Sequence, residues 1–117
     1  MADYRQISVA ETDGVTIVHF NDRRILDAGL IQQLGEDLFQ LVEEEQRDKL
    51  LLNFVDVEFL SSAALNRLIM LDKKVKERGG TLKLCNICGG IMDVFVITRL
   101  DKHFEIIEDE STALAAF

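Results

Sequence analysis

The apolar positions at the start of the chain fall in two short segments that carry β-branched residues, which favour strands. These segments are residues 5–12 and 15–20, and they meet at Asp13-Gly14. That dipeptide suits the positive φ angles of a two-residue turn. The pattern therefore predicts an opening β-hairpin.

After a polar bend at residues 21–24, the apolar residues recur at helical spacing. Between residues 30 and 42 they stand three or four positions apart, and Asp27 is available as the N-cap. Residues 49–55 (KLLLNFV) are nearly all apolar, as in a strand that is covered on both faces. The pattern predicts an amphipathic helix followed by the middle strand of a sheet.

A second series of apolar residues at helical spacing follows Ser61 and Ser62, which predicts a second helix. It stops at Arg78-Gly79-Gly80, where glycine can adopt the left-handed conformation that ends helices. Alternation and helical spacing then continue to the end of the chain. The remaining predicted elements are a strand at 81–85, a helix at 91–98, a strand at 104–107 and a terminal helix capped by Asp109.

The predicted order is β-β-α-β-α-β-α-β-α, about five strands and about four helices. Strands that alternate with helices favour parallel pairing, while the opening hairpin is antiparallel, so the class is α/β with a mixed sheet. The 117 residues suit one domain that spans positions 1–117.

Charge and composition exclude several classes of function. Thirteen Lys and Arg against 21 Asp and Glu give a net charge of −8, which repels nucleic acid and anionic lipid surfaces. Neither a signal peptide nor a membrane-spanning stretch of about 20 apolar residues is evident, so we expect a cytoplasmic protein without direct membrane insertion. Phosphate-binding, dinucleotide and zinc-helix motifs are missing too, which predicts no enzyme, no cofactor and no metal site.

Two cysteines form a Cys-x-x-Cys motif where a strand meets a helix. The dipole of that helix could lower the pKa of a thiol at Cys85 or Cys88, as in redox proteins. However, Cys85 continues a strand and suits packing, and the chain has no proline to stand beside such thiols. Packing is the preferred interpretation, and a redox role is an alternative. His19 and His103 have no neighbouring His or Cys at ligand spacing, which favours structural or surface roles.

Ser61-Ser62-Ala63-Ala64 is the most informative local feature. One hydroxyl can cap the free N–H groups of the helix that begins there, and the helix dipole favours negative charge. Capping alone would explain the two serines. The alternative is that a hydroxyl accepts a phosphoryl group, which adds about −1.5 to −2 charges.

Four segments in register resemble one family. They are VTIVHF…ILDA, LLNFVDVEFLSSAAL, GGTLKLCNI and ITRLDKHFEIIEDESTALAAF, and they cover nearly the whole chain. The chain resembles the STAS domains, named for sulfate transporters and anti-sigma factor antagonists. This resemblance implies a module that binds an anti-sigma factor or a related serine kinase and is switched by serine phosphorylation before the second helix.

The resemblance also suggests site residues. Ser62 is the first candidate for phosphorylation and Ser61 the second, and Asn53 stands where many members have aspartate. Ala63 occupies the position of the phosphorylated hydroxyl in the best-known antagonists, which supports an alternative: a stressosome-like scaffold or transporter-associated subunit without a phosphoswitch. A weak homodimer stays open. The predicted partner-binding residues are Asp27, Ser61, Ser62, Ala63 and Asn66.

Overall fold

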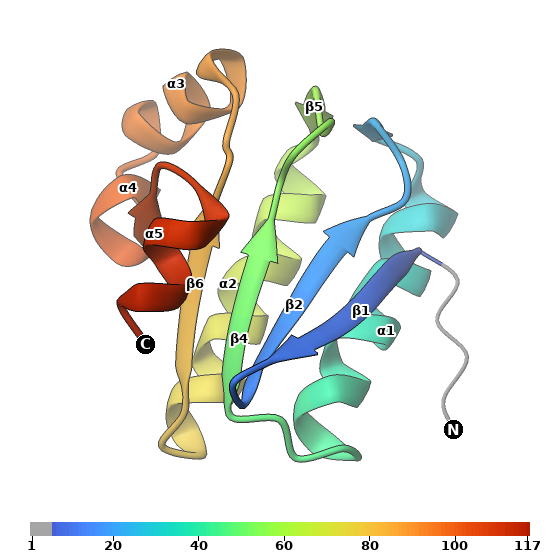
Figure 1. Cartoon of the computed structure of the whole chain (residues 1–117). Helices are drawn as coiled ribbons and strands as arrows, with labels where there is room; N and C mark the ends of the chain where they lie inside the picture. The colour runs from blue at the N-terminus through green and yellow to red at the C-terminus, as the bar shows by residue number, and fades with distance from the viewer. Residues whose placement is uncertain (1–5) are drawn as a thin grey trace.

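A mixed five-stranded sheet forms the centre of the structure, a computed structural model that describes residues 6–117 (Figure 1). Its strands are β1 (Ile7–Thr12), β2 (Val15–Phe20), β4 (Lys49–Asn53), β6 (Thr81–Cys85) and β7 (Glu105–Ile107). They lie in the order β1-β2-β4-β6-β7, with β1 antiparallel to β2 and all other pairs parallel. The predicted α/β class and mixed sheet are confirmed.

Helices cover both faces of this sheet. They are α1 (Ala28–Glu43), α2 (Ser62–Glu77), α3 (Gly89–Ile97), α4 (Leu100–His103) and α5 (Glu110–Ala115). Figure 1 shows α1 and α2 behind the sheet and α5 in front of it. The larger core cluster lies on the α1 and α2 side, and a smaller one, which includes Ile17, Leu51 and Ala113, lies on the α5 side. Within residues 6–117, no helix combines the length and hydropathy needed to cross a membrane.

The predicted turn and caps are present. Asp13 and Gly14 have φ angles of 50° and 81°, and Gly79 after α2 has 73°, so the hairpin turn and the left-handed helix end are confirmed. Asp27 caps α1 by accepting a hydrogen bond from the Leu30 amide at 3.0 Å. The cap of α5 is Asp109, whose pKa is lowered by its hydrogen bonds with Thr112. These features are encoded within a few residues of sequence.

Three short elements were not predicted. Strands β3 (Arg24–Ile25) and β5 (Phe59–Leu60) form a separate two-stranded parallel sheet, and α4 follows α3 after Arg99, whose φ is 63°. Residues 21–24, predicted as a polar bend, therefore run into a strand. Two-residue strands are too short to show periodicity, which explains why the sequence pattern missed them.

The predicted end of the middle strand also differs from the structure. The middle strand was expected to reach residue 55, but β4 ends at Asn53 because the Asn53 side chain accepts a hydrogen bond from the Val55 amide and starts a turn. The first predicted strand began at residue 5, which lies outside the described residues.

Candidate functional site

The residues predicted to form the site lie at one edge of the central sheet. Strands β2, β4 and β6 are parallel, so their carboxyl ends meet at this edge, and α1, α2 and α3 begin beyond them. In Figure 1 this is the upper edge, which carries β5 and α3. Ligands of α/β sheets bind most often at the carboxyl ends of the strands.

The small β3–β5 sheet joins the segments that lead into α1 and α2. Ile25 pairs with Leu60, and the Ser61 amide donates to the Ile25 carbonyl at 3.1 Å. Asp27 follows Ile25 by two residues, and Ser61 directly follows Leu60. This short ladder therefore brings the capped N-termini of both helices to the same surface.

The two candidate serines have different surroundings. Ser61 is the N-cap of α2, partly buried, and its hydroxyl accepts a hydrogen bond from the Ala64 amide at 3.2 Å. Ser62 is the first residue of α2 and exposed, and its hydroxyl has no hydrogen-bond partner among the described residues. Capping thus occupies Ser61, while the Ser62 hydroxyl is accessible for chemistry.

The other predicted binding residues also face solvent. Asp27 and Ala63 are exposed, as is Asn66, which lies one turn further along α2. The Asp27 carboxylate is engaged with the Leu30 amide, and the Asn66 amide lies 3.8 Å from the Met70 sulfur. The structure therefore brings these three residues to the helix N-termini, and Asp27 is the one among them that is committed to a cap.

An apolar pocket of about 130 Å³ lies at the start of α2, where it is lined by Leu60 and Leu65, two residues before and three residues after Ser62. It opens between β5, the first turn of α2 and α3, and we call it the α2–α3 pocket. Phe59 is 47% exposed there and carries the Arg24 guanidinium 4.7 Å above its ring. The pocket is lined by Glu58, Phe59, Leu60, Leu65, Gly90, Ile91 and Val94. Sequence reasoning missed this pocket, although Phe59 stands only three residues before Ser62.

A sequence model of the STAS domain matches residues 6–113. The chain belongs to the STAS domain family. The family assignment agrees with the resemblance seen in the four sequence segments, and it covers every element from β1 into α5.

Relatives of this STAS domain include anti-sigma factor antagonists. BtrV of Bordetella bronchiseptica, assigned as such an antagonist, is 23% identical over 112 residues, which cover 96% of this chain and 94% of BtrV. The anti-sigma-factor antagonist (STAS) domain protein of Planctomyces limnophilus is 25% identical, with a TM-score of 0.85 over 94% of this chain and 96% of that chain. The phosphorylated Bacillus cell fate determinant SpoIIAA shares the fold, with 13% identity and a TM-score of 0.71 over 95% of this chain and 99% of that chain.

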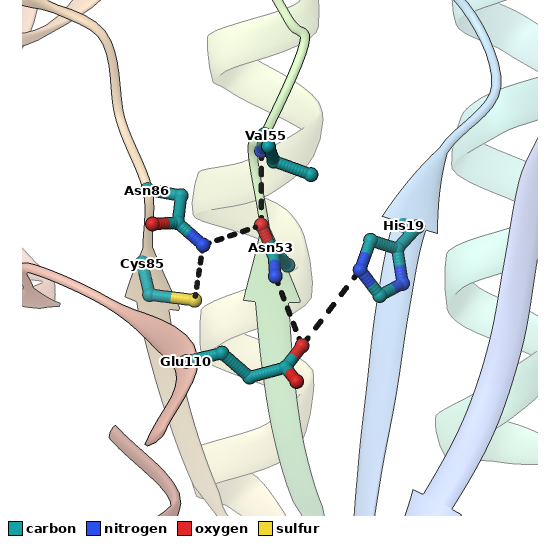
Figure 2. Close-up of polar contacts among 6 residues, drawn as sticks. All are labelled: His19, Asn53, Val55, Cys85, Asn86 and Glu110. Carbon is teal, nitrogen blue, oxygen red and sulfur yellow. Dashed lines mark hydrogen bonds and ion pairs between the residues drawn. The ribbon is translucent and has the colours of Figure 1, made fainter. Parts of the chain in front are cut away.

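A polar cluster lies beneath the loop that leads to Ser61 and Ser62 in this STAS domain (Figure 2). Asn53 is 3% exposed, and its Oδ1 accepts hydrogen bonds from the Val55 amide at 2.9 Å and from Asn86 Nδ2 at 3.0 Å. Its own Nδ2 donates to Glu110 Oε1 at 2.9 Å. The end of β4 is thereby bonded to three separate segments of the chain.

The structure gives little support for a metal site or a thiol redox site at this edge of the sheet. Among residues 6–117, no three His, Cys, Asp or Glu side chains are grouped so that they could hold a metal ion. Both cysteines are free, Cys85 buried and Cys88 exposed. Burial, followed by the negative charges of Glu110 and Asp109, raises the pKa of the Cys85 thiol to about 12. Cys85 is therefore disfavoured as the nucleophilic thiolate of a redox site.

We expect the two thiols to react very differently with an aromatic disulfide reagent. At pH 8 a thiol with a pKa of about 12 is ionised in about one molecule in ten thousand, and Cys85 is also inaccessible. One thiol per chain should react in the native state and two after unfolding. Cys88→Ser, which removes the exposed thiol, should abolish the native reaction, and a fast native reaction of that variant would contradict the assignment.

Proposed function

We propose that this STAS domain is an anti-sigma factor antagonist that binds an anti-sigma factor with serine kinase activity and is switched by phosphorylation of Ser62. The observation that carries the proposal is that Ser62 is exposed as the first residue of α2, the helix whose Leu65 lines the α2–α3 pocket. The antagonist relatives support the class of partner. Such a partner controls transcription, so the interaction would occur in the cytoplasm.

The pocket supplies an apolar contact for the partner. Leu65 lines it and lies three residues after Ser62, so both side chains belong to the same face of α2. Phe59 and Val94 are partly exposed at its rim. Apolar area of this kind, surrounded by polar residues, is typical of a protein-binding surface. A partner that covers the pocket would also cover the Ser62 hydroxyl.

Phosphorylation would then act through charge. A phosphate on Ser62 adds about −1.5 to −2 charges at a surface that the partner would desolvate, on a chain of net charge −8. The N-terminus of α2 tolerates this charge because its free N–H groups and dipole favour anions. The modification therefore weakens binding without unfolding the domain that carries it.

Mass spectrometry of the protein from its own cells tests this proposal. We expect one phosphate per chain, removable by phosphatase and located on Ser62, and affinity capture should recover a kinase that adds it. Ser62→Ala should abolish the modification. Ser61→Ala removes the neighbouring hydroxyl and a cap worth about 1 kcal/mol, but it should leave the phosphate in place. An unmodified protein in both resting and stressed cells would contradict the switch and favour a STAS module without one.

A further inference from the structure

The Asn53 side chain joins two parts of the molecule that are distant in sequence. One is the loop of residues 54–61, which leads from β4 to the start of α2, and the other is the terminal helix α5, which packs on the face of the sheet opposite α1 and α2. Asn53 contacts the loop through the Val55 amide and α5 through Glu110 (Figure 2). We infer that Asn53 is a positioning residue through which the docking of α5 holds the loop in the conformation that presents Ser62.

The polarity of the contact supports this inference. The Val55 and Asn86 N–H groups both need an acceptor at position 53, whereas the Glu110 carboxylate needs a donor. An asparagine amide supplies both, with Oδ1 toward the loop and Nδ2 toward α5. An aspartate of the same shape would supply only acceptors and would place a second carboxylate against Glu110. Asn53 and Glu110 therefore form a matched pair.

Because Asn53 is buried, loss of its hydrogen bond with Glu110 is energetically costly. Asn53 is 3% exposed, so loss of the Glu110 acceptor leaves a buried donor without a partner, and such groups cost much more than an exposed hydrogen bond gains. His19 Nε2 lies 3.7 Å from the same Glu110 oxygen, which gives α5 a second, more exposed contact with the sheet. Of these two contacts with Glu110, only the one from Asn53 leads on to the loop, because Asn53 also binds the Val55 amide.

Other hydrogen bonds hold the two ends of the loop. At its far end the Glu58 and Ser61 amides donate to carbonyls of residues 23 and 25, and at its start the chain bonds to β6 and to itself. The Phe54 amide donates to the Cys85 carbonyl at 2.9 Å, and the Val57 amide closes a turn to the Phe54 carbonyl at 3.0 Å. Asp56 within that turn has a φ angle of 70°, a conformation that costs energy in a residue other than glycine. The side chain of Asn53 is therefore the polar contact that links the Val55 amide, next to this strained residue, to α5.

Amide hydrogen exchange of the purified protein near neutral pH tests the coupling without any partner. Asn53→Asp keeps the size of the side chain and its two accepted hydrogen bonds, but it reverses the polarity toward Glu110. We expect exchange of residues 55–61 to become about tenfold faster or more. Adding Glu110→Gln places a donor opposite the new carboxylate and should restore exchange to within about threefold of the parent.

Glu108→Gln is the matched control. It removes the same charge from the same segment, two residues away, but Glu108 is exposed and its side chain does not contact Asn53. Asn53→Asp combined with Glu108→Gln should therefore exchange as fast as Asn53→Asp alone. Equal rescue by both glutamine substitutions, or no change in the loop of Asn53→Asp, would overturn the inference.

A second pair of variants covers the case in which Asn53→Asp does not fold. Glu110 is partly exposed, so Glu110→Ala should fold and still accelerate exchange in residues 55–61, whereas Glu108→Ala should not. The role of the loop in presenting Ser62 rests on the proposed function, but the exchange result does not. Rescue by Glu110→Gln without any phosphate in cells would refute the switch and leave the coupling intact, and the reverse result would refute the coupling alone.

Discussion

Ser62→Asp should lower the affinity for the captured anti-sigma partner by about hundredfold while the domain stays folded. The residues that line the α2–α3 pocket include no cation for the substituted carboxylate, since the lining residue that carries a charge is Glu58 and the nearby Arg24 lies over the Phe59 ring. A like or unpaired charge that is desolvated in an interface costs several kcal/mol. The same charge at the N-terminus of α2 should change the free energy of unfolding by less than about 1 kcal/mol. Isothermal titration calorimetry and thermal unfolding of the same samples measure both effects.

Ser111→Asp is the control for this substitution. Ser111 is an exposed serine near the start of α5, so the variant has the same added charge at a comparable helix position on the other face of the sheet. It should bind the partner as tightly as the parent. Ser62→Ala, which cannot be phosphorylated, should also bind normally. Full binding by Ser62→Asp, or equal losses in both aspartate variants, would argue against a switch at Ser62.

The parts of the site that the sequence predicted are those with local signals. Asp27 and Ser61 are short polar side chains placed directly before helical stripes, and each caps its helix by bonding an amide three residues later. The hairpin and the parallel strands follow from Asp13-Gly14 and from apolar patterns of five or six residues. Such signals depend on neighbours within one or two turns of chain, which is the range that a sequence pattern covers.

The pocket and the polar cluster depend on residues that are distant in sequence. Phe59 and Val94 line one pocket although 35 positions separate them, and Asn53 bonds Glu110 across 57 positions. The resemblance placed Asn53 where many members of the family have aspartate, but it could not show which donors and acceptors the Asn53 side chain contacts. The difference between Ser61 and Ser62 also needed the structure, because it depends on which hydroxyl the helix uses as its cap.

Alanine substitution of two phenylalanines in the same loop should have opposite effects: one should mainly lower the stability of the fold, and the other should mainly lower the affinity for the partner. Phe54 is 1% exposed, and its ring lies 4.7 Å from that of Phe20 between the sheet and the helices. Phe54→Ala should lower the free energy of unfolding by about 3–5 kcal/mol, since it leaves a cavity in the core and removes an aromatic pair. Urea denaturation followed by circular dichroism measures this loss.

Phe59→Ala is the matched variant, five positions further along the same loop. Phe59 is 47% exposed and its ring lies 4.7 Å from the Arg24 guanidinium, so the free energy of unfolding should fall by no more than about 1 kcal/mol. Partner affinity should nevertheless fall about tenfold or more, because an aromatic side chain at the centre of an interface contributes about 2 kcal/mol or more. Normal binding by Phe59→Ala would exclude the α2–α3 pocket from the partner surface. A stability loss as large as that of Phe54→Ala would instead show that the ring belongs to the core, because only a buried ring leaves a cavity when it is removed.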